Sequence, residues 1–93
     1  MKKLVFKKII SLCIKKPELT DLIWDLFFTM EEKVDLEKRY VIVEALLKGD
    51  KTQRQMAQDL DVSIAKITRG SNELKRVDSE QLNHLRQAML QLF

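Results

Sequence analysis

Hydrophobic residues recur at helical spacing through the first part of the chain and predict two helices. In residues 3–16, apolar side chains fall three and four positions apart with lysines between them, and Pro17 ends or bends this helix. A second helix with the same periodicity is predicted up to Phe28. The apolar positions of the two helices are Phe6, Ile9, Ile10, Cys13, Ile14, Leu19, Leu22, Ile23, Leu26 and Phe27.

A third helix is predicted between Thr29 and Gly49. Thr29 and Glu32 have the spacing of a capping box, which opens a helix by satisfying its first backbone N–H groups, and Gly49 follows its end. Residues 40–47 are apolar on nearly every side of this helix. We therefore expect it to be the central helix, covered all round.

Three further helices are predicted in the second half of the chain. Thr52 and Gln55 form a second capping box, residues 61–63 interrupt that fourth helix, and the serine at the end of the interruption caps a fifth. Asp78 and Gln81 resemble a capping box for a sixth. The positions expected to face inward are Met56, Ala57, Leu60, Ile64, Ile67, Ser71, Leu74, Leu82, Leu85, Met89 and Leu92.

Composition narrows the class to one small all-α domain, residues 1–93. Two glycines and one proline are too few for a sandwich or barrel, and a lone cysteine excludes a disulfide framework or a cysteine-ligated zinc site. At this size a folded monomer buries only about 65% of its extended surface, which favours an oligomer. Lysines break up the apolar runs and no cleavage site follows residues 9–14, so we expect a cytoplasmic protein that does not bind membranes.

The net charge of +3 is unevenly distributed. Residues 1–16 carry six lysines and no acid, and residues 51–76 carry six basic and three acidic side chains. Between them, residues 17–50 carry four basic and nine acidic side chains. This asymmetry suits a protein that presents one face to a polyanion, although a basic helix face can also be simply solvated.

Residues 52–75 have the pattern of a helix-turn-helix. A short helix precedes a three-residue turn and a second helix whose outer face is basic and polar, as needed to enter the DNA major groove and contact phosphates. A plain helical hairpin with a solvated basic face is the alternative. The outer-face residues are Lys66, Thr68, Arg69, Asn72 and Lys75.

The sequence resembles the bacterial tryptophan repressor family without gaps over about residues 29–75. The resemblance rests on Arg39, on Val-Ile-Val-Glu at residues 41–44, and above all on Ile-Thr-Arg-Gly-Ser-Asn at residues 67–72. It implies an all-α, six-helix, intertwined homodimer. It also implies that double-stranded operator DNA is bound only when L-tryptophan occupies a pocket between the dimer core and each DNA-reading head.

The resemblance also implies a division of the single domain into two parts. Residues 1–50 and 77–93 would form the dimer core, and residues 51–76 the helix-turn-helix head. Two other hypotheses remain open: a helix-turn-helix regulator that is constitutive or responds to another ligand, and a helical protein-protein module with a basic face. For the lysine-rich first helix, binding to anionic lipid is the rival interpretation.

The resemblance implies an L-tryptophan site with six residues. Arg39 and Arg69 would hold the flat indole between their guanidinium planes, and Arg69 would also pair with the ligand carboxylate. Thr29 matches a hydroxyl at that carboxylate, Gly70 leaves room for the ring edge, and the end of the second helix supplies carbonyls to the ammonium. The six residues are Leu26, Phe28, Thr29, Arg39, Arg69 and Gly70.

Some of these residues also have explanations without a ligand. Gly70 costs roughly 1 kcal/mol inside a helix, and close helix packing or a kink would account for it. The capping box accounts for Thr29, and Arg39 can pair with Asp35 or Glu32 on its own helix.

Three positions near the ligand depart from the family pattern. Glu73 stands where the family has serine, and its carboxylate could accept from the ligand ammonium or repel the ligand carboxylate. Phe28 replaces a leucine, and Met30 replaces a proline at the start of the third helix.

The resemblance likewise implies a set of DNA contacts. Arg54 matches an arginine that reaches a guanine, while the tip of the second head helix, Ile64 and Ala65, meets bases through backbone amides and water. Ala57 stands where a lysine is usual, and Lys66 where a threonine is usual. The implied contacts are Gln53, Arg54, Ile64, Ala65, Lys66, Thr68, Arg69, Asn72 and Lys75.

Other reactive residue types have no chemical role in this interpretation. Trp24 is expected to pack, His84 to be exposed, and Cys13 to be a small buried apolar group. No nucleophile, base and orienting group can be assembled from these side chains, so we expect neither catalysis nor a bound metal.

Overall fold

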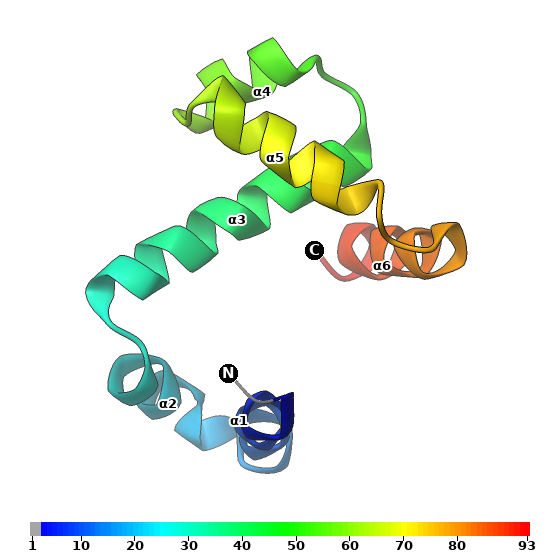
Figure 1. Ribbon diagram of the computed structural model, residues 1–93. Helices are drawn as coiled ribbons and strands as arrows, with labels where there is room; N and C mark the ends of the chain where they lie inside the picture. The colour runs from blue at the N-terminus through cyan, green and yellow to red at the C-terminus, as the bar shows by residue number, and fades with distance from the viewer. Residues whose placement is uncertain (1–2) are drawn as a thin grey trace. The chain divides into compact units, whose positions relative to one another are not determined.

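The computed structural model describes residues 3–93, which form six α-helices and one short 3-10 helix with no strand among them (Figure 1). The all-α class is confirmed. None of the helices in this range combines the length and the apolar composition that a membrane crossing requires. The elements are α1 (Lys3–Lys15), the 3-10 helix (Pro17–Leu19), α2 (Thr20–Phe27), α3 (Met30–Lys48), α4 (Gln53–Leu60), α5 (Ile64–Leu74) and α6 (Ser79–Leu92).

Side-chain caps start the helices where the sequence predicts them. At α3 the Thr29 hydroxyl accepts from the Glu32 N–H at 3.1 Å, and the Thr29 N–H donates to the Glu32 carboxylate at 2.8 Å. Thr52 and Gln55 make the same reciprocal pair at α4, at 3.1 and 2.9 Å. Both capping boxes are confirmed. Each satisfies two backbone donors that would otherwise lack a partner.

The caps of α5 and α6 are single hydrogen bonds. Ser63 accepts from the Lys66 N–H at 3.3 Å, as predicted. Asp78 accepts from the Gln81 N–H at 3.2 Å, but within residues 3–93 the return bond from the Gln81 side chain is absent. The third capping box is therefore half formed, with the acidic side chain at the positive end of the α6 dipole.

Two residues with positive φ end helices. Gly49 follows α3 with φ of 65°, and its N–H donates to the Ala45 carbonyl at 3.2 Å. Asp61 ends α4 with φ of 53°, a conformation that aspartate tolerates better than most side chains. The predicted interruption at residues 61–63 is thus a tight turn begun by a left-handed residue.

The chain divides into two compact units, and residues 3–34 lie in the first. Ile23 of α2 is buried there, and the Trp24 ring packs against Phe28 with centroids 5.1 Å apart. The Lys33 ammonium lies 5.9 Å from the Trp24 ring centroid and pairs with Asp25 at 2.9 Å. Trp24 is a packing residue, as predicted.

Most apolar side chains of α1 and α2 are exposed in the single chain. Ile14 is 73% exposed, and Cys13, expected to be buried, is only half-buried. Helices this short have too little chain around them to cover both faces. The other exposed members of the predicted apolar faces are Phe6, Ile10, Leu19, Leu22, Leu26 and Phe27.

The second unit, residues 35–93, holds the main core. Ile67 of α5 is fully buried against Ile42 of α3 and Met56 of α4. α6 is tied to α3 by a hydrogen bond from the Arg86 Nε to the Leu47 carbonyl at 2.9 Å. Half-buried side chains close this core on its outside: Ala45, Leu46, Ala57, Leu60 and Val62.

Three expectations about burial in this unit are wrong for the single chain. Ile64 was expected inside but is 48% exposed, because α5 packs on α3 around Gly70 and its first turn lies beyond that contact. Leu85 and Leu92 of α6 are exposed as well. The central helix α3 is not covered all round, since Val41 on its apolar segment is exposed.

Ile67→Val should lower the free energy of unfolding by about 0.5–1.5 kcal/mol, because it removes a buried methylene from a site without solvent. Ile64→Val is the matched control, since the same change on the exposed first turn of α5 should cost less than about 0.5 kcal/mol. Urea denaturation of both variants measures the difference. Equal losses would show that Ile67 is not the centre of the core.

Candidate ligand pocket and nucleic-acid interface

A pocket of about 250 Å³ lies between α3 and α5. It is slightly smaller than the roughly 300 Å³ at which sites for drug-sized ligands begin, so it suits a small molecule. All of its lining belongs to the second unit. The lining residues are Asp35, Lys38, Arg39, Ile42, Val43, Lys66, Arg69, Gly70 and Glu73.

The pocket brings together the two arginines that the sequence analysis singled out. Arg39 comes from α3 and Arg69 from α5, and both side chains are exposed. Among residues 3–93 neither guanidinium is ion-paired, so the pairing of Arg39 with Asp35 or Glu32 that would explain it without a ligand is not formed. Two free guanidinium planes on opposite walls can stack on a flat ring, which lysine cannot do.

Gly70 is explained by the packing of α5 on α3. A Cβ at Gly70 would lie 3.1 Å from the Ile42 Cγ2 atom and 3.3 Å from the Leu46 Cδ1 atom. Both distances are shorter than ordinary contacts between carbon atoms, which are near 3.5–4.0 Å. The glycine thus allows a close helix crossing, and the pocket that it also lines is a consequence of that crossing.

Charge in the pocket is mixed and predominantly basic. Four basic side chains and two acidic ones line it, so it can attract a carboxylate and also offers partners for an ammonium group. Lys66, expected at DNA, is one of the basic residues. Lys38 was missed by sequence reasoning, since only the crossing of α3 and α5 shows that its side chain shares this pocket.

The remaining residues of the implied ligand site belong to the first unit and are not among the pocket residues. Leu26 is exposed on α2, and Phe28 is half-buried against Trp24. Thr29 caps α3, and that role uses its hydroxyl. Their contacts with a ligand remain predictions.

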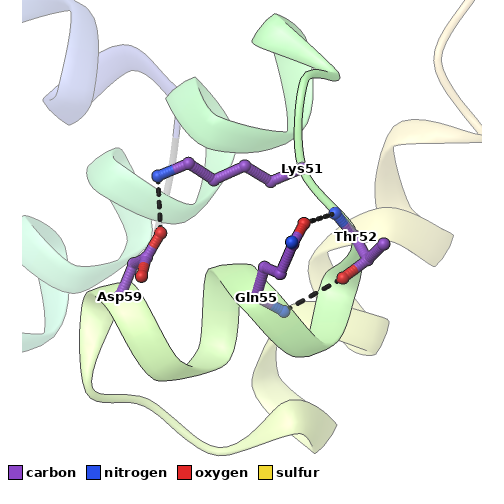
Figure 2. A network of polar contacts seen from close by, with 4 residues as sticks. All are labelled: Lys51, Thr52, Gln55 and Asp59. Atoms are coloured by element: carbon purple, nitrogen blue, oxygen red, sulfur yellow. Dashed lines mark hydrogen bonds and ion pairs between the residues drawn. The ribbon is translucent and has the colours of Figure 1, made fainter.

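α4, the first helix of the predicted helix-turn-helix, is held at both ends by side chains (Figure 2). The Thr52 and Gln55 capping box lies at its beginning, and Lys51, just before it, pairs with Asp59 in its last turn. The hydrogen bond to Asp59 and its negative charge raise the pKa of Lys51 above the usual value. These contacts span α4 and fix the segment that packs against α5.

The outer face of α5 carries most of the implied DNA contacts. A second, open hollow on this face is lined by Arg69 and Glu73 again, together with residues one turn to either side. Arg76 is among these residues. The sequence analysis did not identify it as a candidate site residue, because it follows the end of the predicted helix. The hollow is lined by Ala65, Thr68, Arg69, Asn72, Glu73 and Arg76.

Two implied DNA contacts are connected to each other. The Thr68 hydroxyl lies 3.0 Å from the Gln53 Oε1 atom and 3.0 Å from the Ile64 carbonyl, and donates toward both. The amide oxygen of Gln53 is therefore directed at α5, which leaves its NH₂ group as the donor available to a phosphate. The other implied contacts are exposed: Arg54, Ile64, Ala65, Lys66, Arg69, Asn72 and Lys75.

Ala57, which stands where the family usually has a lysine, is part of the core. Ala57 is half-buried and packs against the cluster of Ile42, Met56 and Ile67. Its small side chain fits between α4 and the rest of the core, where a longer one would have to turn outward.

Comparison with known proteins gives one consistent result. The family model described as Trp repressor protein matches residues 3–89. The Trp operon repressor homolog of Chlamydia trachomatis serovar D is 44% identical over 73 residues, covering 76% of this chain and 78% of that protein. Those of Chlamydia caviae and Vibrio vulnificus strain YJ016 are 48% and 45% identical, covering 74% of this chain and 70% and 68% of their own lengths.

Gly70→Ala should lower the free energy of unfolding by about 1 kcal/mol. Overpacking against Ile42 and Leu46 costs about 1–3 kcal/mol and outweighs the roughly 1 kcal/mol that alanine gains as a helix former. Asn72→Ala, on the exposed side of the same helix, should instead stabilise slightly. Thermal and urea denaturation compare the two, and a stabilised Gly70→Ala protein would contradict the close packing.

Proposed function

Because this chain belongs to the Trp repressor protein family, we propose that it is a transcriptional repressor that binds double-stranded operator DNA as a homodimer when L-tryptophan is bound. In this proposal residues 51–76 are the DNA-reading head, and residues 1–50 and 77–93 form the dimer core. L-tryptophan is the corepressor ligand, and no catalytic step is involved.

The position of Arg69 is the observation that carries the proposal. Arg69 lines the pocket between α3 and α5 and also the hollow on the outer face of α5. A ligand held by Arg69 in the pocket would fix this side chain and, with it, the adjoining surface of the helix that approaches DNA. Ligand binding then shifts the population of heads toward the DNA-competent arrangement.

The pocket supports a flat, charged ligand. Arg39 and Arg69 hold the indole between them, and Arg69 also pairs with the ligand carboxylate. Gly70 lies at the edge of the ring. Leu26 and Phe28 supply carbonyls to the ammonium, and Thr29 faces the carboxylate; these three assignments rest on the family pattern.

The exposed face of the head supports binding in the major groove. The head carries six basic and three acidic side chains between residues 51 and 76. Arg54 reads a guanine, and Gln53, Thr68, Asn72 and Lys75 bind phosphates or bound water. Ile64 and Ala65, at the tip of α5, meet base edges, which agrees with the exposure of Ile64.

The apolar surface of the single chain supports the homodimer. Large hydrophobic side chains on α1, α2, α3 and α6 are exposed, and a soluble monomer rarely leaves so many uncovered. A second copy would cover them and complete the core around α3. Two symmetric heads would then meet half-sites about 34–36 Å apart, one turn of B-form DNA.

Selection from a random duplex library tests the whole proposal. With L-tryptophan present, the protein should enrich inverted half-sites whose centres lie about 10 base pairs apart. Without L-tryptophan the enrichment should disappear, and sedimentation should show a dimer in both conditions. Enrichment that is independent of L-tryptophan would favour a constitutive regulator. Weak, steeply salt-dependent binding of every duplex would favour the protein-protein module.

Arg39→Ala should lose most L-tryptophan affinity while ligand-free, nonspecific DNA binding stays nearly unchanged, because Arg39 lines the pocket and not the outer hollow. Arg39→Lys should lose it too, since an ammonium cannot stack on the indole as a planar guanidinium does. Calorimetry measures the affinity for L-tryptophan, and fluorescence anisotropy measures the ligand-free binding of DNA. A parallel loss of both would contradict the role of Arg39.

Arg54→Ala should cost about 1–3 kcal/mol of operator affinity and relax the preference at one base pair, as expected for a guanine contact. Lys75→Ala is the comparison, because loss of a phosphate contact weakens all sequences about equally and lowers the salt dependence. Anisotropy titrations with single-base operator variants distinguish the two patterns. A uniform effect of Arg54→Ala would make it a phosphate contact.

A further inference from the structure

We propose that Arg76 binds a phosphate of the operator backbone and so extends the DNA-binding surface of the head by one turn beyond α5. This inference rests on the proposed function, because it concerns the same DNA-reading head. Arg76 is outside the set of contacts that the family resemblance implies, and it follows Leu74, the last residue of α5, by two positions.

The first argument is the position of Arg76 on a helix face. The residues that line the outer hollow recur three and four positions apart, which is the spacing of one face of a helix. Arg76 continues this face past the end of α5, because Lys75 keeps right-handed helical backbone angles and the Arg76 N–H donates to the Glu73 carbonyl at 3.1 Å. The face runs through Ala65, Thr68, Arg69, Asn72, Glu73 and Arg76, and the resemblance implies DNA contacts for four of them.

The second argument is the charge of this face. Arg69 and Glu73 carry opposite charges, so without a further cation the hollow would have no net charge. Arg76 makes the hollow positive, as binding to a polyanion requires. Its side chain is exposed and makes no ion pair among residues 3–93. The planar guanidinium group is therefore available to a phosphate, with which it can form two parallel hydrogen bonds.

The third argument is the distance of Arg76 from the tip of α5, and it selects a phosphate over a base. Ala65 and Arg76 are eleven positions apart, which corresponds to a rise of about 16 Å along the helix. The major groove is only about 12 Å wide and about 8.5 Å deep. When the tip of α5 meets base edges, Arg76 thus lies outside the groove, beside the sugar-phosphate backbone. A contact there adds affinity without reading the sequence.

A purely structural role is the alternative for Arg76. A cation near the C-terminal end of a helix stabilises the partial negative charge of that end, and Arg76 has such a position at α5. Lys48 has the same kind of position in the last turn of α3, is exposed, and is not among the residues of the hollow. Lys48→Ala is therefore the matched control, because it removes one helix-end cation without removing the proposed contact.

Anisotropy titrations at several salt concentrations, with L-tryptophan present, test the inference on the selected operator and on unrelated duplexes. Arg76→Ala should weaken the binding of every duplex by the same factor, about tenfold, and should reduce the steepness of log affinity against log salt by about one. Arg76→Lys should keep the steepness and recover part of the affinity. Lys48→Ala should change neither. L-tryptophan affinity without DNA should be unaltered in all three variants, since neither residue lines the pocket.

Single methylphosphonates in the operator locate the contact, because each replaces one charged phosphate oxygen by a neutral methyl group. At one position in each half-site this replacement should weaken the wild type about as much as Arg76→Ala does. The same replacement should cause no further loss in Arg76→Ala, whose partner for that phosphate is already gone. In Lys48→Ala it should weaken binding as in the wild type.

The outcomes separate the inference from the proposed function. Lower affinity and salt dependence in Arg76→Ala but not in Lys48→Ala, with one phosphate to which Arg76→Ala is insensitive, support the contact. Unchanged salt dependence in Arg76→Ala, or a loss confined to one base pair, overturns it while L-tryptophan-dependent operator binding by the wild type stands. Equal losses in both alanine variants, with lower melting temperatures, would assign Arg76 to helix stability and overturn it as well. A wild type that binds no DNA overturns both proposals.

Discussion

At Gly70 the backbone of α5 lies so near α3 that one added carbon atom would come within 3.1 Å of Ile42 and 3.3 Å of Leu46. This close crossing brings Ile67 against Ile42 and Met56, and so builds the core that joins α4 and α5 to α3. The same crossing leaves the pocket between α3 and α5 beside this contact. The core, the placement of α4 and α5, and the pocket therefore all depend on the close approach of Gly70 to α3. A change that displaces α5 would alter all three.

In the proposed function two neighbouring surfaces of α5 have different tasks, and Arg69 lines both of them. On the inner side it lines the pocket with Arg39, and on the outer side it lines the hollow with Asn72 and Arg76. Glu73 shares both positions. In the proposed function Arg69 couples ligand binding to DNA binding, because a ligand in the pocket fixes the same side chain that contacts DNA. The coupling requires no long path through the protein.

The helices were predictable because local chemistry sets their ends. The capping pairs at Thr29 and Thr52, the serine at Ser63 and the glycine at Gly49 act within one turn of the residues they cap, so spacing in the sequence identifies them. Burial was predicted less well. The apolar period marks a face as hydrophobic without saying whether this chain or a second copy covers it, and Ile64, Leu85 and Leu92 show the difference.

The candidate site was predicted in the same uneven way. Arg39, Arg69 and Gly70 were identified by a family pattern, and the structure puts all three at one pocket. Lys38 and Arg76 were missed because neither belongs to a motif. Lys66 was assigned to DNA alone, because its place in the helix-turn-helix pattern does not show that it also lines the pocket.

The sequence by itself determined where the helices begin and end and which positions carry charge, since both follow from interactions between residues a few positions apart. The tertiary structure decided which of those side chains share a pocket. It also decided why residue 70 is a glycine, because a contact between α5 and α3 joins residues that are far apart in the chain. Local spacing carries no information about the distance at which two helices cross, and that distance is set by how their side chains fit together.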